Sequence, residues 1–162
     1  MIVARRSVTV VGMLLRAARP DEATVLSELA LRSKAHWGYD DAFLEACRAE
    51  LTLRPADLAE QRATVAQVGD RVVGFYTLAG QAPEGELACL FVEPGHIGTG
   101  VGRRLWQHAV DTARALDFER FTLDADPFAE TFYRKMGAVR IGVTPSDSIP
   151  GRLLPQMAYH LA

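Results

Sequence analysis

The chain has 162 residues, of which 49% are hydrophobic and 23% are charged. This length and composition suit a single globular domain that can bury its own core without disulfides. The formal net charge of −2 provides no broad basic surface, so we expect no nucleic-acid partner. No apolar stretch approaches the roughly 20 residues that a membrane span needs, so we expect no membrane partner and a cytoplasmic location.

Two cysteines and four histidines are the candidate soft metal ligands. Cys47 and Cys89 lack metal-ligand spacing and are too few for a disulfide framework. The histidines are scattered along the chain and form no HxxxH pair. We therefore expect no bound metal.

The first dozen residues differ from the rest of the chain. Arg5 and Arg6 before an apolar run faintly resemble the start of a signal peptide. Arg16 soon interrupts that run, and no small-residue cleavage site follows. We expect residues 1–12 to be an N-terminal extension and residues 13–162 to form one domain.

The N-terminal half combines two helices with a hairpin. After Pro20, apolar residues at helical spacing predict a helix that runs to about Ser33. Gly38 lies in the break that follows, and the pair Gly69-Asp70 is typical of a tight hairpin turn. The predicted elements are a strand at 14–18, a helix at 20–33, a helix from Phe43 that stops before Pro55, and hairpin strands within 62–79.

The C-terminal half alternates strands with helices. Residues 86–92 are apolar on both faces, which is typical of a central strand. The predicted elements are strands at 86–92, 121–125, 138–143 and 153–161, with helices that end near Leu116 and at Met136. This order mixes a hairpin-built half with a βαβ crossover. It predicts an α+β fold with three α/β/α layers, and not a doubly wound parallel sheet.

Three glycines alternate at Gly98, Gly100 and Gly102, between the strand at 86–92 and the next helix. A turn without side chains at a helix N-terminus lets several backbone N–H groups converge on an anion, and the helix dipole reinforces them. The pattern therefore predicts a phosphate-bearing ligand at this turn.

Two common phosphate motifs do not fit the turn. A P-loop needs Lys and then Ser or Thr after its last glycine, whereas Val101 follows Gly100. A dinucleotide fingerprint needs a third glycine where Arg103 or Leu105 stands, and it belongs inside repeated βαβ units.

The residues around the turn resemble the GCN5-related N-acetyltransferase (GNAT) family. In that family a strand ends in V-x-P, and a Q/R-x-x-G-x-G/A turn binds the pyrophosphate of acyl-CoA through backbone amides. Here V-E-P at 92–94 is followed by I-G-T-G-V-G at 97–102. Ile97 stands where the family usually has arginine or glutamine.

A second block of residues strengthens the resemblance. The family carries N-x-x-A-x-x-F-Y-x-x-x-G one helix and one strand later, and here D-P-F-A-E-T-F-Y-R-K-M-G occupies 126–137. Asp126 replaces the asparagine that usually contacts the pantetheine arm. The resemblance covers residues 14–162. It implies the GNAT fold, a mixed and mostly antiparallel sheet that is splayed at the acyl-CoA site.

The resemblance implies an N-acetyltransferase with acetyl-CoA as co-substrate. The acetyl group would pass to a primary amine, on a small molecule or a peptide, by direct attack in a ternary complex. The alternative is a non-catalytic module that binds acyl-CoA for regulation, since positions 97 and 126 depart from the family pattern. Domains of this family frequently pair, which leaves a homodimer open. The residues implied in cofactor binding are Leu90, Phe91, Val92, Ile97, Gly98, Thr99, Gly100, Val101, Gly102, Arg103, Asp126 and Tyr133.

Three of the residues are candidates for catalysis. The family's F-Y pair makes Tyr133 the candidate general acid toward the CoA sulfur. The backbone N–H of Val92 is the candidate donor to the oxyanion. Glu86 is the candidate general base. It precedes Val92 by an even number of residues on one strand, so we expect both side chains on the same face.

The acceptor pocket is expected in the break between the first two helices, where this family shapes it. His36, Trp37 and Tyr39 lie in that break, and such a cluster in a loop favours a binding surface. The loop 146–152 is expected to form the opposite wall, with Arg152 as a candidate partner for a carboxylate.

Overall fold

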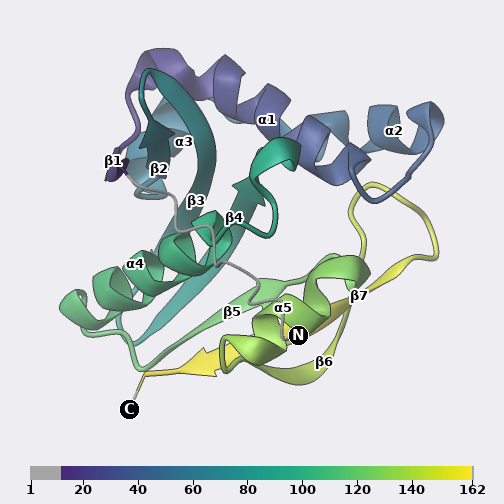
Figure 1. Ribbon diagram of the computed structural model, residues 1–162. Helices are drawn as coiled ribbons and strands as arrows, with labels where there is room; N and C mark the ends of the chain where they lie inside the picture. The colour runs from purple at the N-terminus through teal and green to yellow at the C-terminus, as the bar shows by residue number, and fades with distance from the viewer. Residues whose placement is uncertain (1–11, 162) are drawn as a thin grey trace, which may run out of the picture.

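The computed structural model describes residues 12–161 and contains one seven-stranded sheet (Figure 1). All neighbouring strands pair antiparallel except β4 and β5, which pair parallel. The extension expected over residues 1–12 lies, up to residue 11, outside the described residues. In spatial order the strands are β1 (Met13–Ala17), β2 (Thr64–Val68), β3 (Arg71–Gln81), β4 (Glu84–Val92), β5 (Arg120–Asp124), β7 (Leu153–His160) and β6 (Val139–Pro145).

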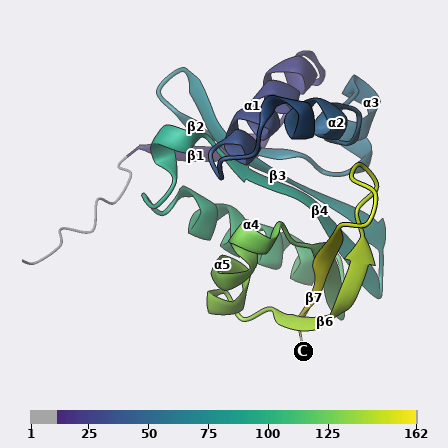
Figure 2. The same cartoon turned by 90° about the vertical axis from the view of Figure 1, so that its right-hand side faces the viewer.

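In the described part of the chain, five α-helices cover the two faces of the sheet, which confirms the predicted α+β fold with three layers (Figure 2). Helices α1, α2 and α3 pack on one face, whereas α4 and α5 pack on the other. Within residues 12–161, no helix combines the length and the apolar character that crossing a bilayer would take. The helices are α1 (Ala23–Ala35), α2 (Asp41–Leu51), α3 (Pro55–Glu60), α4 (Val101–Ala115) and α5 (Glu130–Lys135).

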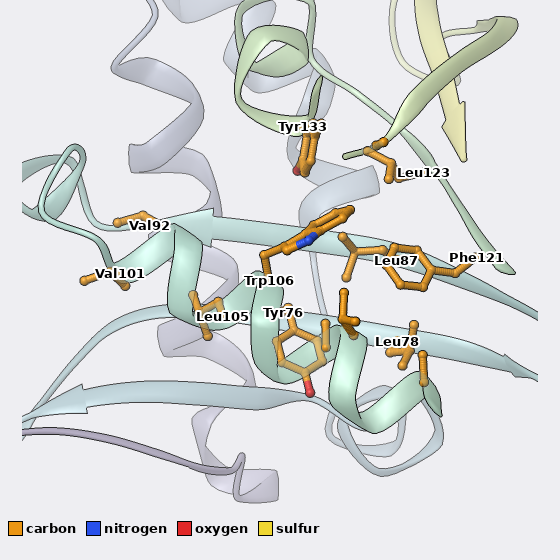
Figure 3. Packing of buried hydrophobic residues seen from close by; sticks show 14 of the residues in the cluster. Tyr76, Leu78, Leu87, Val92, Val101, Leu105, Trp106, Phe121, Leu123 and Tyr133 are labelled. Atoms are coloured by element: carbon orange, nitrogen blue, oxygen red, sulfur yellow. The ribbon is translucent and has the colours of Figure 1, made fainter. Parts of the chain in front are cut away.

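Each face of the sheet has its own apolar core. On the α4 side, Trp106 packs edge-on against Phe121 and Tyr159, with ring centroids 5.3 Å away in both cases, and lies below Tyr133 (Figure 3). On the α1 side, fully buried leucines of α1 pack against Phe75 of β3. The sheet thus separates two cores, and helices from both sides can reach its central strands.

Helix α3 is an element that the sequence pattern did not predict. Pro55 was expected only to end the preceding helix, whereas it begins a new one. Proline also suits the first turn of a helix, because its missing N–H would have no partner there. The carboxylate of Asp57 accepts a hydrogen bond from the backbone N–H of Arg54 at 2.8 Å and caps the helix. Leu58 then anchors this helix in the core on the α1 side.

The sheet opens between its two central strands, as predicted. β4 and β5 pair only at Glu84↔Arg120, Gly85↔Phe121 and Glu86↔Thr122. β4 continues to Val92 without a partner on that side, while β5 pairs onward with β7 alone. The splayed strands leave backbone groups of β4 facing an opening in the middle of the sheet.

Strand β4 contains a β-bulge at Ala88, which changes the face on which Glu86 lies relative to Val92. Thr77 of β3 faces Cys89, whereas the next residue, Leu78, faces Leu87, so Ala88 has no partner on β3. The extra residue reverses the alternation of side chains along the strand. Leu87 and Val92 therefore face α4, whereas Glu86 and Cys89 face α1 and α2. The prediction that Glu86 and Val92 share a face is wrong.

Candidate active site

A cleft of about 680 Å³ occupies the opening between β4 and β5. The glycine turn closes one end, α5 forms one side, and the ends of α1 and α2 form the other. Many of the residues singled out in the sequence meet here. They are Trp37, Glu86, Leu90, Phe91, Val92, Ile97, Gly98, Gly100, Gly102, Arg103, Asp126 and Tyr133.

The glycine turn has the geometry that an anion site needs. Gly98 and Gly100 have φ values of +83° and +96°, a left-handed conformation that side chains rarely tolerate. The first hydrogen bond of α4 is donated by the N–H of Arg104 to the carbonyl of Gly100, at 3.1 Å. The N–H groups of Val101 and Gly102 precede that bond, so they have no partner inside the helix. They are free to bind an anion together with the positive end of the helix dipole.

Gly102 brings the start of α4 close to the cleft. A Cβ atom at this position would lie 3.4 Å from the ring of Phe132 and 3.6 Å from the side chain of Val92. Val101 and Thr99 do not line the cleft with their side chains, since Val101 is fully buried and the Thr99 hydroxyl donates to the His96 carbonyl at 2.5 Å. These two residues can contribute to the turn only through their backbone.

The exposed edge of β4 presents backbone groups to the cleft. The N–H of Glu93 donates to the carbonyl of Val73 at 2.8 Å, and Val92 lies opposite Gly74. In an antiparallel pair this bond makes Val92 a non-hydrogen-bonded residue, whose N–H and C=O point away from β3. The same alternation applies to Leu90. Both residues therefore direct their backbone groups into the opening.

Tyr133 lies on the α4 side of the cleft, in apolar surroundings. Its ring lies beside that of Trp106 (Figure 3), with the centroids 5.8 Å apart. The ring centroid of Phe132 is 5.2 Å away. Burial raises the pKa of its phenol above the ordinary value, with smaller contributions from Cys89 and Asp126. The hydroxyl therefore stays protonated at neutral pH and can act as a proton donor.

Glu86 enters the cleft from the other face of β4, beside Cys89. Desolvation raises the pKa of the Cys89 thiol to about 11, and the charges of Glu50 and Glu86 add to this effect. Glu50, at the end of α2, accepts a hydrogen bond from the Ser148 hydroxyl. Three further carboxylates line the cleft, those of Glu50, Asp124 and Asp147. They could not be predicted, because their spacing in the chain gives no sign that they converge.

Asp126 is the centre of a polar cluster on the α1 side of the cleft. Its carboxylate lies 3.4 Å from Lys34 Nζ and 3.6 Å from Arg152 Nη2, and it accepts a hydrogen bond from the Tyr39 hydroxyl at 3.0 Å. Arg152 also donates to the Tyr39 oxygen at 2.5 Å. Desolvation, and then the Asp126 charge, raise the pKa of Tyr39 to about 12. Nothing in the sequence pattern predicts Lys34 in this role.

Aromatic rings complete this side of the cleft. Trp37 stacks on Phe128 with ring centroids 5.6 Å apart, and Tyr39 stacks on Phe43 at 4.0 Å. Because the sequence predicts the acceptor pocket at this place, we call the following residues the acceptor wall: Trp37, Tyr39, Phe43 and Phe128, with Lys34 and Arg152.

Three of the four predicted acceptor residues do not line the cleft, namely His36, Tyr39 and Arg152. Within the acceptor wall, Tyr39 and Arg152 lie behind the residues that line the cleft, and both contact Asp126. His36 is exposed at the end of α1, where its ring meets Trp37 edge-on at 5.0 Å. Of the predicted acceptor side chains, Trp37 is therefore the one that lines the cleft directly. Across residues 12–161, no three His, Cys, Asp or Glu side chains converge as a metal site would require.

An α/β/α sandwich whose central strands open beside a glycine turn and a helix N-terminus defines the class of GNAT acetyltransferases. Residues 18–147 match the family model described as the acetyltransferase (GNAT) domain. The chain therefore belongs to the GNAT acetyltransferase family, as the sequence motifs predicted.

Solved structures with the same fold include three that cover nearly the whole chain. A GCN5-related N-acetyltransferase from Rhodopseudomonas palustris is 26% identical, with a TM-score of 0.80, over 94% of this chain and 98% of that one. PaiA N-acetyltransferase from Thermoplasma acidophilum, in complex with coenzyme A, is 16% identical, with a TM-score of 0.74, over 92% and 99%. Ard1 from Thermoplasma volcanium is 19% identical, with a TM-score of 0.72, over 94% and 99%. A comparison with curated proteins gave no match.

Proposed function

We propose that the protein transfers the acetyl group of acetyl-CoA to a primary amine by direct attack in a ternary complex. The observation that carries this proposal is the free edge of β4, where the backbone of Leu90 and Val92 faces the cleft between the glycine turn and Tyr133. Coenzyme A is bound in the structure of the PaiA relative, which supports the same donor here.

The chain offers fitting partners for the pyrophosphate and for the pantetheine arm of the donor. The N–H groups at the glycine turn and the start of α4 would hold the pyrophosphate, with Arg103 nearby. The backbone of Leu90 and Val92 would bind the amides of the pantetheine arm as an added strand binds a sheet edge. These contacts come mainly from the backbone, so they tolerate Ile97 in place of the usual arginine or glutamine.

The same geometry supplies the groups for acetyl transfer. The amine nitrogen forms a bond to the thioester carbon, and the N–H of Val92 stabilises the negative charge on the carbonyl oxygen. Glu86 takes a proton from the amine. As the C–S bond breaks, Tyr133 gives its proton to the departing thiolate, and its raised pKa keeps that proton available until then.

The acceptor wall would bind the amine-bearing substrate. Trp37 and Phe128 present aromatic surface to the cleft, and carboxylates such as Glu50 and Glu86 favour a cationic amino group before its deprotonation. The substrate would be a small amine or the amino group of a peptide.

A thiol-release assay tests the proposal. The protein is incubated with acetyl-CoA and a panel of small amines and peptides, and free CoA is followed with a thiol reagent. We expect turnover with at least one acceptor, and we expect Glu86→Gln to flatten the rise of kcat/KM with pH. Tight binding of acetyl-CoA in a calorimeter without turnover on a broad panel would instead identify a non-catalytic acyl-CoA-binding module.

A further inference from the structure

The polar cluster around Asp126 holds two cations and one carboxylate in covered surroundings. The side chains of Lys34, Asp126 and Arg152 are 14%, 15% and 16% exposed. Within the part of the chain that the structure describes, Asp126 is the one acidic residue in ion-pair distance of either cation. Charges with so little access to water need a counter-charge, because desolvation is otherwise costly.

This charge count explains why position 126 carries an aspartate. An asparagine there, as in the family pattern, would leave Lys34 and Arg152 close together without a negative partner. The carboxylate also accepts a hydrogen bond from the Tyr39 hydroxyl, which in turn accepts one from Arg152. Two segments that are far apart in the sequence, the end of α1 with Tyr39 and the loop 146–152, thus depend on one side chain.

Asp126 also reaches the segment that carries the aromatic surface of the cleft. Its Oδ1 accepts a hydrogen bond from the backbone N–H of Phe128 at 2.9 Å. Phe128 stacks against Trp37 at an interplanar angle of 7°. The fixed position of Phe128 therefore supports the ring of Trp37.

We propose that Asp126 is a positioning residue that holds the acceptor wall together, and that it does not serve the pantetheine arm. This inference rests on the proposed function, because it takes the acceptor wall to be the surface that binds the amine. Asp126 acts through Tyr39, Lys34 and Arg152, to which it is joined by a hydrogen bond and two ion pairs. These residues come from the end of α1, the segment after it and the loop 146–152.

The substitution Asp126→Asn tests this role with two separate readouts. It keeps the size of the side chain and its bond to Phe128, but it removes the counter-charge. We expect the KM for the amine to rise about tenfold, as when one partner of a covered ion pair is removed. The Kd for acetyl-CoA, measured by calorimetry, stays within about twofold. Asp111→Asn, an exposed aspartate on α4 that pairs with Arg114, is the matched control and should change neither value.

A second substitution separates positioning from a general loss of structure. Lys34→Met in the Asp126→Asn background removes one of the two uncompensated cations. We expect the double variant to recover much of the lost affinity for the amine, which a merely unfolded cleft would not do. Tyr39→Phe, which removes one hydroxyl, is the milder variant if Asp126→Asn does not fold.

A readout without turnover keeps this inference distinct from the proposed function. Trp37 is half-buried in the acceptor wall, and Trp106 is buried in the core, so acrylamide quenching of tryptophan fluorescence reports mainly on Trp37. We expect stronger quenching in Asp126→Asn and Tyr39→Phe, even if no amine is acetylated. Unchanged quenching with an unchanged KM, or a tenfold loss of acetyl-CoA affinity with the amine KM intact, overturns the proposal.

Discussion

The two sides of the cleft differ in the groups that they expose: backbone groups on the α4 side and side chains on the α1 side. On the α4 side, the surface consists of backbone groups of β4 and of the glycine turn, and apolar packing around Trp106 holds them in place. On the α1 side, the acceptor wall consists of side chains that are joined by charges, hydroxyl groups and stacked rings around Asp126. A backbone surface suits a donor with fixed chemistry. A side-chain surface can be changed one residue at a time, as a variable acceptor requires.

This difference predicts how each side responds to substitution. Changes on the α4 side should affect acetyl-CoA or the chemical step for every acceptor. Changes in the acceptor wall should affect the acceptor alone, whereas Glu86, which enters from the same side, is assigned to the chemical step.

Glu22→Gln tests whether anchoring α1 at its start influences the acceptor wall at its end. Hydrogen bonds from the Arg16 side chain and from the backbone N–H of Arg19 lower the pKa of Glu22 to about 2, although burial by itself raises it. Because the folded pKa lies below the unfolded value, the stabilisation is complete above about pH 4.5 and is lost as the pH falls toward 2. We expect a loss of about 3 kcal/mol in the free energy of unfolding at pH 7.

Urea unfolding at pH 7, 5 and 3 checks this expectation, with the exposed Asp21→Asn as control. The difference between wild type and Glu22→Gln should shrink as the pH falls. The KM for the amine should not change. A raised KM would show that the acceptor wall depends on the whole of α1 rather than on Asp126.

Tyr133→Phe tests the chemical role of the α4 side. The substitution keeps the ring against Trp106 and removes only the proton donor. We expect kcat to fall about a hundredfold, with little change in the KM for the amine. Tyr159→Phe, whose ring packs on the same Trp106, is the control and should keep its kcat. Full activity of Tyr133→Phe would remove the tyrosine from the role of general acid.

Gly100→Val tests the backbone site at the glycine turn. A β-branched residue at a φ of +96° is strained, so the turn must rearrange and its N–H groups lose their alignment. We expect the Kd for acetyl-CoA to rise about tenfold, and the change should be the same for every acceptor. Gly95→Val is the matched control, because Gly95 has no positive φ and open space around it. Equal affinity of the two variants would contradict the turn as an anion site.

Much of the α4 side could be predicted from the sequence. Alternating glycines before an amphipathic stretch can form few structures other than a turn at a helix start, because only glycine adopts φ values such as those of Gly98 and Gly100 freely. The apolar run at 86–92 likewise required a central strand. Such local patterns depend on backbone sterics and on burial, which act over a few residues.

Less of the α1 side could be predicted, because its contacts join distant segments. Trp37 and Tyr39 were recognised as a loop cluster, but nothing in their spacing showed that Lys34 and Arg152 would converge on Asp126. The bulge at Ala88 could not be predicted either, since no residue type marks it. It places Glu86 on the face of β4 opposite to Val92.

The sequence by itself determined the three layers and the place of the glycine turn, since these follow from periodicity and glycine sterics. Two local motifs pointed to the family, and the resemblance to that family implied the splayed sheet. Only the tertiary structure decided which face of β4 carries Glu86 and which side chains surround Asp126. The physical reason is that a bulge register and a shared counter-charge depend on neighbours brought together by folding, and not on neighbours in the chain.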